Sequence, residues 1–154
     1  MTPRATSKSE GADPAATRHR AREVALQMLY HWEVGGVGMA EVLQTWPSWP
    51  EDAGRLPDPL QAFAARLADG TAAAIASIDP LISEAASSWR IERMNVVDRL
   101  ILRLAIFEFL HERDTPASVI INEAIELARS FSADEAVPFV NGVLDAVRRR
   151  LERE

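Results

Sequence analysis

The chain has 154 residues, of which 47% are hydrophobic and 26% are charged, a composition typical of one globular domain with a sizeable core. It contains no cysteine, which excludes disulfide bonds and cysteine-ligated zinc or iron–sulfur sites. No apolar run approaches the roughly 18 residues of a membrane span, and the N-terminus lacks the apolar segment of a signal peptide. We therefore expect a cytoplasmic protein.

The charge is acidic overall but unevenly distributed. There are 23 acidic and 17 basic residues, a net charge of −6 that taken alone argues weakly against a nucleic-acid-binding protein. Arginines nevertheless cluster near both ends of the chain, at Arg18, Arg20 and Arg22 and again at Arg148, Arg149, Arg150 and Arg153. An acidic protein can bind RNA through a local basic patch of this kind.

The first predicted element is preceded by residues 1–17, which have no apolar period and which we expect to form a disordered tail. Thr17 is predicted to cap a helix from about Arg18 to Trp32, and a group of glycines ends it. A short helix is predicted over Met39–Trp46. Residues 47–59 contain four prolines and are predicted to form a loop.

Two further helices are predicted in the middle of the chain. The first runs from about Leu60 to Ile75, with Phe63 and Leu67 on its inner side. The Asp-Pro pair at 79–80 is typical of a helix start, because aspartate caps well and proline suits the first helical position. This second helix is predicted to continue to about Trp89.

The C-terminal half carries three more helix signals. Asn95 is predicted to cap one helix, and the Thr-Pro pair at 115–116 resembles the start of the next. Residues 132–135 fit a capping box for the last helix, although Pro138 also allows a start nearer Val137. No strand-like alternation of useful length appears, so we predict an all-α fold of about seven helices.

Two sequence blocks carry a family resemblance. Residues 121–131 read INEAIELARSF and residues 139–145 read FVNGVLD, while residues 18–23 and 27–30 give an arginine-rich start followed by Gln-Met-Leu-Tyr. In this order and spacing, the blocks strongly resemble the bacterial NusB family. The resemblance covers roughly residues 18–147 and is weakest between 37 and 75.

The resemblance implies two small helical bundles packed together in a single NusB-like domain over residues 18–154. It also implies a transcription antitermination factor that binds boxA RNA of ribosomal RNA leader transcripts. The partners would be the ribosomal protein NusE and the RNA polymerase antitermination complex. The resemblance implies no cofactor and no metal.

The basic helix start is the sharpest electrostatic signal in the sequence. Cations in the first turns of a helix oppose its dipole, and together with free N–H groups they suit a phosphate. The other interpretation is a solvated helix end that happens to be basic. The resemblance favours RNA contact and implies that role for Arg18, Arg20 and Arg22, with His19 where relatives often have arginine.

Three further residues are implied in RNA binding by the resemblance. Tyr30, the only tyrosine, would stack on an unpaired base, or it would be a half-buried core residue. Phe139 has the same two alternatives, and Glu135 lies in a loop where charge tunes RNA affinity. Gly142 inside a helix costs about 1 kcal/mol against alanine, which suggests a close helix–helix approach at this position.

The resemblance implies that Asp98, with Arg99 beside it, contacts NusE. Asp98 follows the Asn95 cap by three residues, so a variant of the capping box is the alternative, and the two roles are compatible. The polar face of residues 122–126 is expected to be solvated. The arginines at 148–150 are expected to complement the dipole of the last helix, and we assign them no RNA role.

Catalysis is not expected. His19, His31 and His111 have no metal-ligand spacing, and the sequence lacks a glycine-rich phosphate loop and a nucleophile elbow. Two other functions remain open. One is the RNA-binding module of a ribosomal RNA cytosine methyltransferase, which shares this fold, and the other is a homodimeric protein-interaction module.

Overall fold

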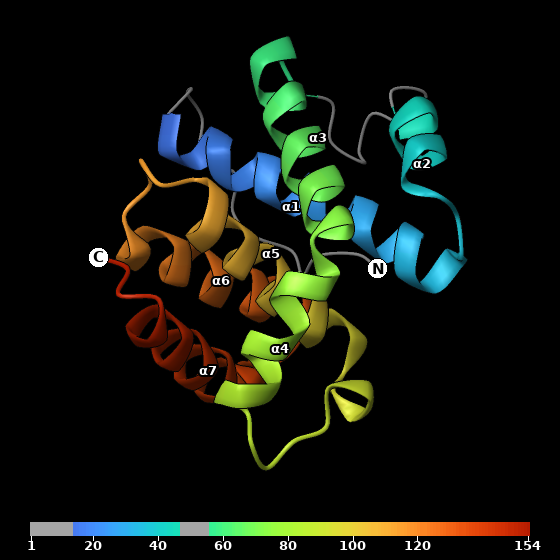
Figure 1. Cartoon of the computed structure of the whole chain (residues 1–154). Helices are drawn as coiled ribbons and strands as arrows, with labels where there is room; N and C mark the ends of the chain where they lie inside the picture. The colour runs from blue at the N-terminus through green and yellow to red at the C-terminus, as the bar shows by residue number, and fades with distance from the viewer. Residues whose placement is uncertain (1–13, 47–55) are drawn as a thin grey trace. The chain divides into compact units, whose positions relative to one another are not determined.

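The computed structural model describes the backbone of residues 14–46 and 56–154. Within these two ranges it contains seven α-helices and no strand, which confirms the all-α prediction (Figure 1). None of the described helices is long and apolar enough to cross a membrane. The chain divides into two compact units, Met1–Ala72 and Ala73–Glu154, and each is described by itself below.

The first unit contains α1 (Pro14–Gly35), α2 (Met39–Thr45) and nearly all of α3 (Asp58–Ala73). Apolar residues recur at helical spacing along α1, so Val24, Leu26 and Met28 are buried and α1 packs against α2. Gly36, with φ +68°, follows the last residue of α1 in the left-handed conformation that glycine adopts at little cost.

α1 begins four residues earlier than predicted, at Pro14. Thr17 therefore lies inside the helix and is not its N-cap. The physical reason is that proline suits the first helical position, where its missing N–H has no helical partner in any case. The rest of the expected tail, residues 1–13, and most of the expected loop, residues 47–55, lie outside the described residues.

α3 starts two residues before its predicted position, and Ala74 then separates it from α4 (Ile75–Ala85). The prediction that the Asp-Pro pair at 79–80 starts a helix is wrong, because Pro80 lies inside α4. Pro80 removes one backbone bond to the Ala76 carbonyl, and both residues are exposed to water. Asp79 instead accepts hydrogen bonds from Arg103 Nε at 2.9 Å and Nη2 at 2.8 Å.

α5 (Val96–His111) is the central helix of the second unit. Every residue from Leu100 to Phe109 is buried, and the helix packs against α4, α6 and α7. Asn95 Oδ1 accepts hydrogen bonds from the backbone N–H of Val97 at 2.9 Å and of Asp98 at 3.4 Å. The predicted Asn95 cap is therefore confirmed.

α6 (Ala117–Phe131) starts directly after the Thr-Pro pair at 115–116, within one residue of its predicted start. α7 (Val137–Arg150) starts at the later of the two predicted positions, with Pro138 in its first turn. The capping box predicted for residues 132–135 is not formed. These residues lead into a 3₁₀ turn, η4 (Asp134–Ala136), and no side chain caps α7.

The close helix–helix approach predicted at Gly142 is not observed. Gly142 is exposed on α7, and a Cβ atom added to it would meet no heavy atom within 4 Å. Packing within the described residues therefore does not require glycine at this position.

The C-terminal arginines are held by the second unit itself. Arg153 is buried, and its guanidinium donates to the carbonyl oxygens of Phe109 at 2.9 Å, Glu112 at 3.0 Å and Thr115 at 2.9 Å. These carbonyls belong to the end of α5 and the loop after it, where helical partners run out. Arg153 thus closes the α5–α6 connection.

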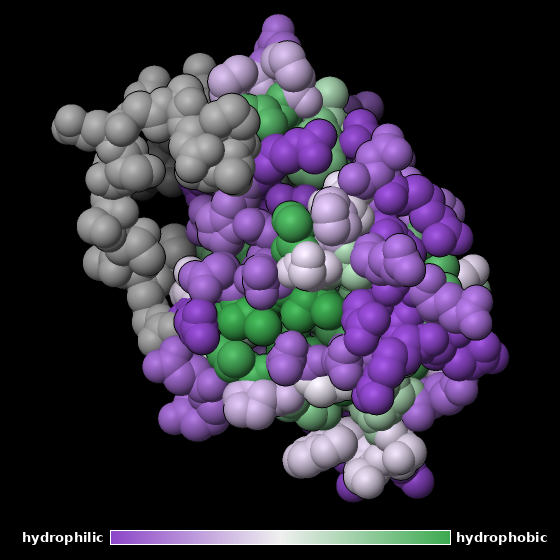
Figure 2. Space-filling view, turned by 90° about the vertical axis from the view of Figure 1, so that its left-hand side faces the viewer, coloured by the Kyte–Doolittle hydropathy of each residue, from purple (hydrophilic) through white to green (hydrophobic). Residues whose placement is uncertain are grey.

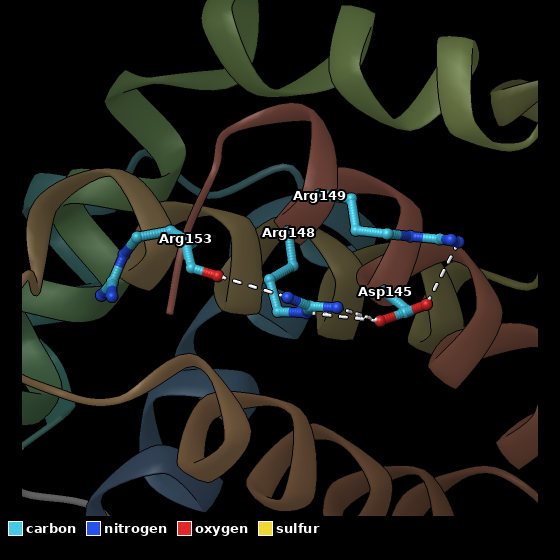
Figure 3. A network of polar contacts seen from close by, with 4 residues as sticks. All are labelled: Asp145, Arg148, Arg149 and Arg153. Carbon is cyan, nitrogen blue, oxygen red and sulfur yellow. Dashed lines mark hydrogen bonds and ion pairs between the residues drawn. The ribbon is translucent and has the colours of Figure 1, made fainter.

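Asp145 organises the neighbouring arginines of α7 (Figure 3). It accepts from Arg148 Nη2 at 2.7 Å and pairs with Arg149 Nη2 at 3.1 Å, while Arg148 Nη1 reaches the Arg153 carbonyl at 3.5 Å. The hydrogen bond from Arg148, followed by the charge of Arg149, holds the pKa of Asp145 below its ordinary value.

Candidate nucleic-acid interface

The predicted RNA-binding arginines lie in the second and third turns of α1. Because α1 begins at Pro14, Arg18 is its fifth residue and Arg22 its ninth. The influence of the helix dipole falls off within the first turn, so these cations neither oppose it strongly nor share a phosphate site with the free N–H groups. The electrostatic argument from the helix end is therefore wrong, and the placement of these side chains has another cause.

That cause is an aromatic ring on α3. The guanidinium carbon of Arg18 lies 4.8 Å from the centre of the Phe63 ring, and that of Arg22 lies 5.5 Å from it. Such contacts are attractive because the face of the ring carries negative charge density, and each contributes about 0.5–1 kcal/mol at an exposed site. Residues 18 and 22 are one helical turn apart, so both reach the same ring.

The arginines of the cluster differ in exposure. Arg18 is exposed, whereas Arg22 is only 2% exposed. A direct contact between Arg22 and RNA would require its side chain to leave this environment. The geometry instead gives Arg22 a part in holding Phe63, and it leaves Arg18 at the surface.

His19 and Arg20 meet a carboxylate on the same helix. Glu23 Oε1 lies 3.9 Å from His19 Nε2 and 3.6 Å from Arg20 Nη1. Both basic side chains are partly exposed, at 25% and 31%, so these surface pairs contribute little to stability and are easily exchanged for another anion. Arg20 and His19 are therefore placed where RNA contact remains open to them.

Tyr30 is half-buried on α1, in agreement with both of its predicted roles. It lies on nearly the same face of the helix as His19, eleven residues and roughly 16 Å further along the axis. Whether its ring meets a base stays a prediction.

The second unit contains a hollow of about 410 Å³ on its own surface. It brings together residues that sequence analysis assigned to different partners: Asp98, Glu135 and Phe139. The complete lining is Trp89, Arg93, Met94, Asn95, Asp98, Ser132, Ala133, Glu135, Ala136 and Phe139. One predicted contact for NusE, Asp98, and two predicted contacts for RNA, Glu135 and Phe139, therefore share one hollow.

Asp98 does not complete a capping box. Its Oδ1 is buried and has no hydrogen-bond partner among the described residues, so the side chain returns no bond to Asn95. A buried carboxylate oxygen without a partner is costly, and a donor entering the hollow would relieve that cost.

Arg99 does not line the hollow, and its side chain binds a backbone carbonyl of the second unit instead. Its Nη1 donates to the carbonyl oxygen of Ile91 at 3.1 Å, in the 3₁₀ turn η3 (Ile91–Arg93) that precedes α5. A direct contact between Arg99 and a partner stays a prediction, but the geometry gives this residue a part in positioning η3.

Sequence analysis missed Trp89 as a site residue, because it was assigned to the end of a helix. α4 in fact ends at Ala85, and Trp89 is 60% exposed at the hollow, with its ring centre 5.8 Å from that of Phe139 in an edge-to-face arrangement. The available signal was a tryptophan in a polar segment next to the arginine at 90. A large exposed aromatic ring of this kind marks a binding surface more often than a core.

Hydrophilic residues cover most of the face seen in Figure 2, and hydrophobic residues reach the surface in smaller areas between them. Among the described residues, the strongly exposed large hydrophobic side chains are those of Val34, Trp89 and Val119. Trp89 is the largest of them and lies at the hollow. In the part of the chain that the structure describes, no three His, Asp or Glu side chains are grouped as a metal site requires.

Comparison with known proteins gives a consistent result. The family model described as the NusB family matches residues 19–149. The transcription antitermination protein NusB of Koribacter versatilis is 44% identical over 138 residues, covering 90% of this chain and 92% of the relative. That of Symbiobacterium thermophilum is 41% identical over 142 residues, covering 88% of this chain and 92% of the relative.

Solved structures resemble the chain as well. NusB of T. maritima is 32% identical, with a TM-score of 0.75 over 86% of this chain and 90% of that one. A structure described as antitermination factors NusB and NusE in complex with dsRNA contains a chain that is 27% identical, with a TM-score of 0.76. That match covers 88% of this chain and 98% of the other.

Proposed function

The chain belongs to the NusB family, and from this premise we propose that it acts in transcription antitermination by binding boxA RNA together with NusE. The main support is that the family match and the exposed basic and aromatic side chains of the two units point to the same function. The relative solved with NusE and dsRNA supports both partners. The protein would act in the cytoplasm, as part of the RNA polymerase complex, as one domain over residues 18–154 and without catalysis of its own.

The first unit would contact the RNA backbone. Arg18 is exposed on the Phe63 ring, and Arg20 and His19 are partly exposed beside Glu23. Guanidinium groups donate well to phosphate oxygens, and these contacts position RNA without reading its sequence. Arg22 would act indirectly, by holding Phe63.

The second unit would contact an unpaired base. Phe139 and the exposed Trp89 present aromatic rings at one hollow, and sequence-specific RNA recognition commonly stacks unpaired bases on such rings. Glu135 at the rim would tune affinity, because its charge repels phosphates. Tyr30 would add a second stacking surface on the first unit.

NusE would meet the part of the hollow that Asp98 lines. The partnerless Oδ1 of Asp98 suits a cationic or N–H donor from a protein partner. Arg99 would support this contact through η3. The two partners would then bind on adjoining sides of one hollow.

The function is tested by titrating labelled boxA RNA with the protein alone and with NusE, and following fluorescence anisotropy. We expect boxA to bind more tightly than a scrambled RNA of equal length, and NusE to increase that preference. Equal affinity for both RNAs, with and without NusE, would overturn the proposed function.

Asp98→Lys tests the partner contact. We expect it to weaken NusE pairing by about tenfold or more, because it replaces the acceptor with a like charge facing the partner's donor. Calorimetric titration with NusE measures the pairing, and thermal unfolding of the free protein measures stability. Asp114→Asn, at an exposed position in the loop after α5, is the control. If the free energy of unfolding falls as much as the free energy of NusE binding, Asp98 has a structural role and no specific role in the NusE contact.

A further inference from the structure

Arg93 is a charged residue of the aromatic hollow that the proposed function leaves without a role. It lines the hollow of about 410 Å³ together with Trp89 and Phe139. Ligand pockets typically have volumes of roughly 300–1,000 Å³, so the hollow is large enough for a ligand. Arg93 is exposed, and its guanidinium forms no ion pair or hydrogen bond with the residues that the structure describes. Its donors are therefore available to a ligand.

The backbone that carries Arg93 is fixed on both sides. Arg93 is the last residue of η3, and Arg99 Nη1 holds the Ile91 carbonyl at the start of that turn at 3.1 Å. The next residue, Met94, is buried, and its N–H donates to the Ile91 carbonyl at 3.3 Å. The Asn95 cap of α5 follows directly. The exposed side chain of Arg93 thus extends from an ordered backbone, which lowers the entropy lost on binding.

The hollow carries charges of both signs. Among the described residues that line it, Arg93 is the one basic residue, and Asp98 and Glu135 are the acidic ones. Asp98 Oδ1 is buried, whereas Glu135 is exposed. The two carboxylates repel a phosphate, so a phosphate is favoured only where the guanidinium of Arg93 reaches it. A bound nucleotide would therefore be oriented, with its base at the rings and its phosphate at Arg93.

We propose that Arg93 binds the backbone phosphate next to the RNA base that stacks at Trp89 and Phe139. A base and its neighbouring phosphate are joined through one sugar, so a cation on the lining of the hollow meets the phosphate while the rings hold the base. A guanidinium edge donates two parallel hydrogen bonds to phosphate oxygens. Aromatic platforms combined with basic groups are the usual means of binding single-stranded nucleic acid. This inference rests on the proposed function and gives the second unit a phosphate contact of its own.

The first test titrates labelled boxA RNA with the full chain over a series of salt concentrations. Arg93→Ala should lower affinity roughly three- to tenfold and reduce the slope of log affinity against log salt by roughly 0.7, the value for one contact to a single strand. Arg93→Lys keeps the charge but loses the planar fork, so its affinity should lie between those of Arg93→Ala and the wild type.

Arg90→Ala is the matched control. Arg90 is an exposed arginine three residues before Arg93, and it does not line the hollow. Its removal changes the net charge equally but should leave RNA affinity near that of the wild type. Thermal unfolding shows whether each variant keeps the fold. Equal RNA affinity of the Arg93→Ala and Arg90→Ala variants would overturn the proposal.

A scan of the RNA tests whether the phosphate and the base belong together. Each phosphate of boxA is replaced in turn by a neutral methylphosphonate, and each base in turn is removed. One methylphosphonate should weaken binding to the wild type and have no effect with Arg93→Ala. One missing base should likewise have no effect with Trp89→Ala. The two positions should be adjacent in the RNA, and a separation of more than one nucleotide would contradict the shared site.

Calorimetric titration with NusE separates an RNA contact from a protein contact, because Asp98 lines the same hollow. Arg93→Ala should pair with NusE as the wild type does. A loss of NusE pairing as large as the loss of RNA affinity would overturn the assignment to RNA. If the wild type prefers boxA while Arg93→Ala and Arg90→Ala bind it alike, the proposed function stands without this inference. If the wild type does not prefer boxA at all, both fail.

Discussion

The two arginine clusters of this chain look alike in sequence and differ in surroundings. At the C-terminus, Arg148 and Arg149 pair with Asp145, and the buried Arg153 donates to three backbone carbonyls. Near the N-terminus, Arg18 meets an uncharged ring and stays exposed. The first arrangement pairs its charges with groups of the protein itself, and the second leaves the charge of Arg18 at the surface.

The difference shows that an arginine cluster is informative about function only once its partners are known. The carbonyls around the buried Arg153 satisfy its guanidinium donors and leave little for a ligand. An aromatic face attracts the cation but accepts no in-plane hydrogen bond, so the N–H edge of Arg18 remains directed elsewhere. We therefore expect stability effects from one cluster and RNA effects from the other.

The largest expected effect is on the C-terminal side. Arg153→Ala leaves the carbonyls of Phe109, Glu112 and Thr115 without this donor, and we expect it to lower the free energy of unfolding by about 2–4 kcal/mol. Urea denaturation measures it. Arg150→Ala, which removes an exposed pair with Glu84 at 3.2 Å, should cost no more than about 0.5 kcal/mol. Equal free energies of unfolding for the two variants would show that Arg153 does not stabilise the α5–α6 connection.

The next effect is on the N-terminal side. Replacing Arg18 and Arg20 together with alanine should lower boxA affinity roughly five- to thirtyfold and flatten its salt dependence, because two phosphate contacts are lost. Unfolding by urea should change little, since both side chains are at least partly exposed. The matched double variant Arg149→Ala with Arg150→Ala should keep RNA affinity near the wild type. If both double variants weaken binding equally, the comparison between the clusters is wrong.

The smallest expected effect is the pH dependence of stability that the charge of Asp145 produces in the C-terminal cluster. The pKa of Asp145 is lowered when folded, chiefly by the hydrogen bond from Arg148, so its carboxylate stabilises the fold above the ordinary aspartate pKa. That contribution is lost as pH falls through the lowered value. Asp145→Asn should therefore lower the melting temperature slightly at neutral pH, and the difference should shrink in acid. A difference that stays constant with pH would point to packing instead of charge.

Much of the fold was predictable from local patterns. Local signals predicted about seven helices, and each of the seven α-helices in the described residues overlaps one of them. The Asn95 cap and the start of α7 at Val137 follow from local backbone chemistry. The wrong helix start came from a sequence signal that is compatible with two positions in a helix. An aspartate before a proline suits a helix start, yet Asp79 lies inside α4, where its carboxylate pairs with Arg103 of α5.

The candidate site was predictable only in part. Arg18 and Arg20 stand out in the sequence, and the structure leaves them accessible, but Arg22 is buried. Trp89 was missed, because its significance depends on its contact with Phe139. Trp89 and Phe139 are fifty residues apart, and no local period links them.

The sequence by itself determined the helical character, the NusB family and the positions of the arginines, because periodicity, motifs and charge are local properties of the chain. Only the tertiary structure decided what each arginine does. A guanidinium has the same charge everywhere, but its role depends on whether a carboxylate, a carbonyl or a ring lies against it. The carboxylates Glu23 and Asp145 lie one turn away on the same helix as their arginines. The ring and the carbonyls come from other helices, as Phe63 does for Arg18 and Phe109 for Arg153, and so only the folded chain brings them into place.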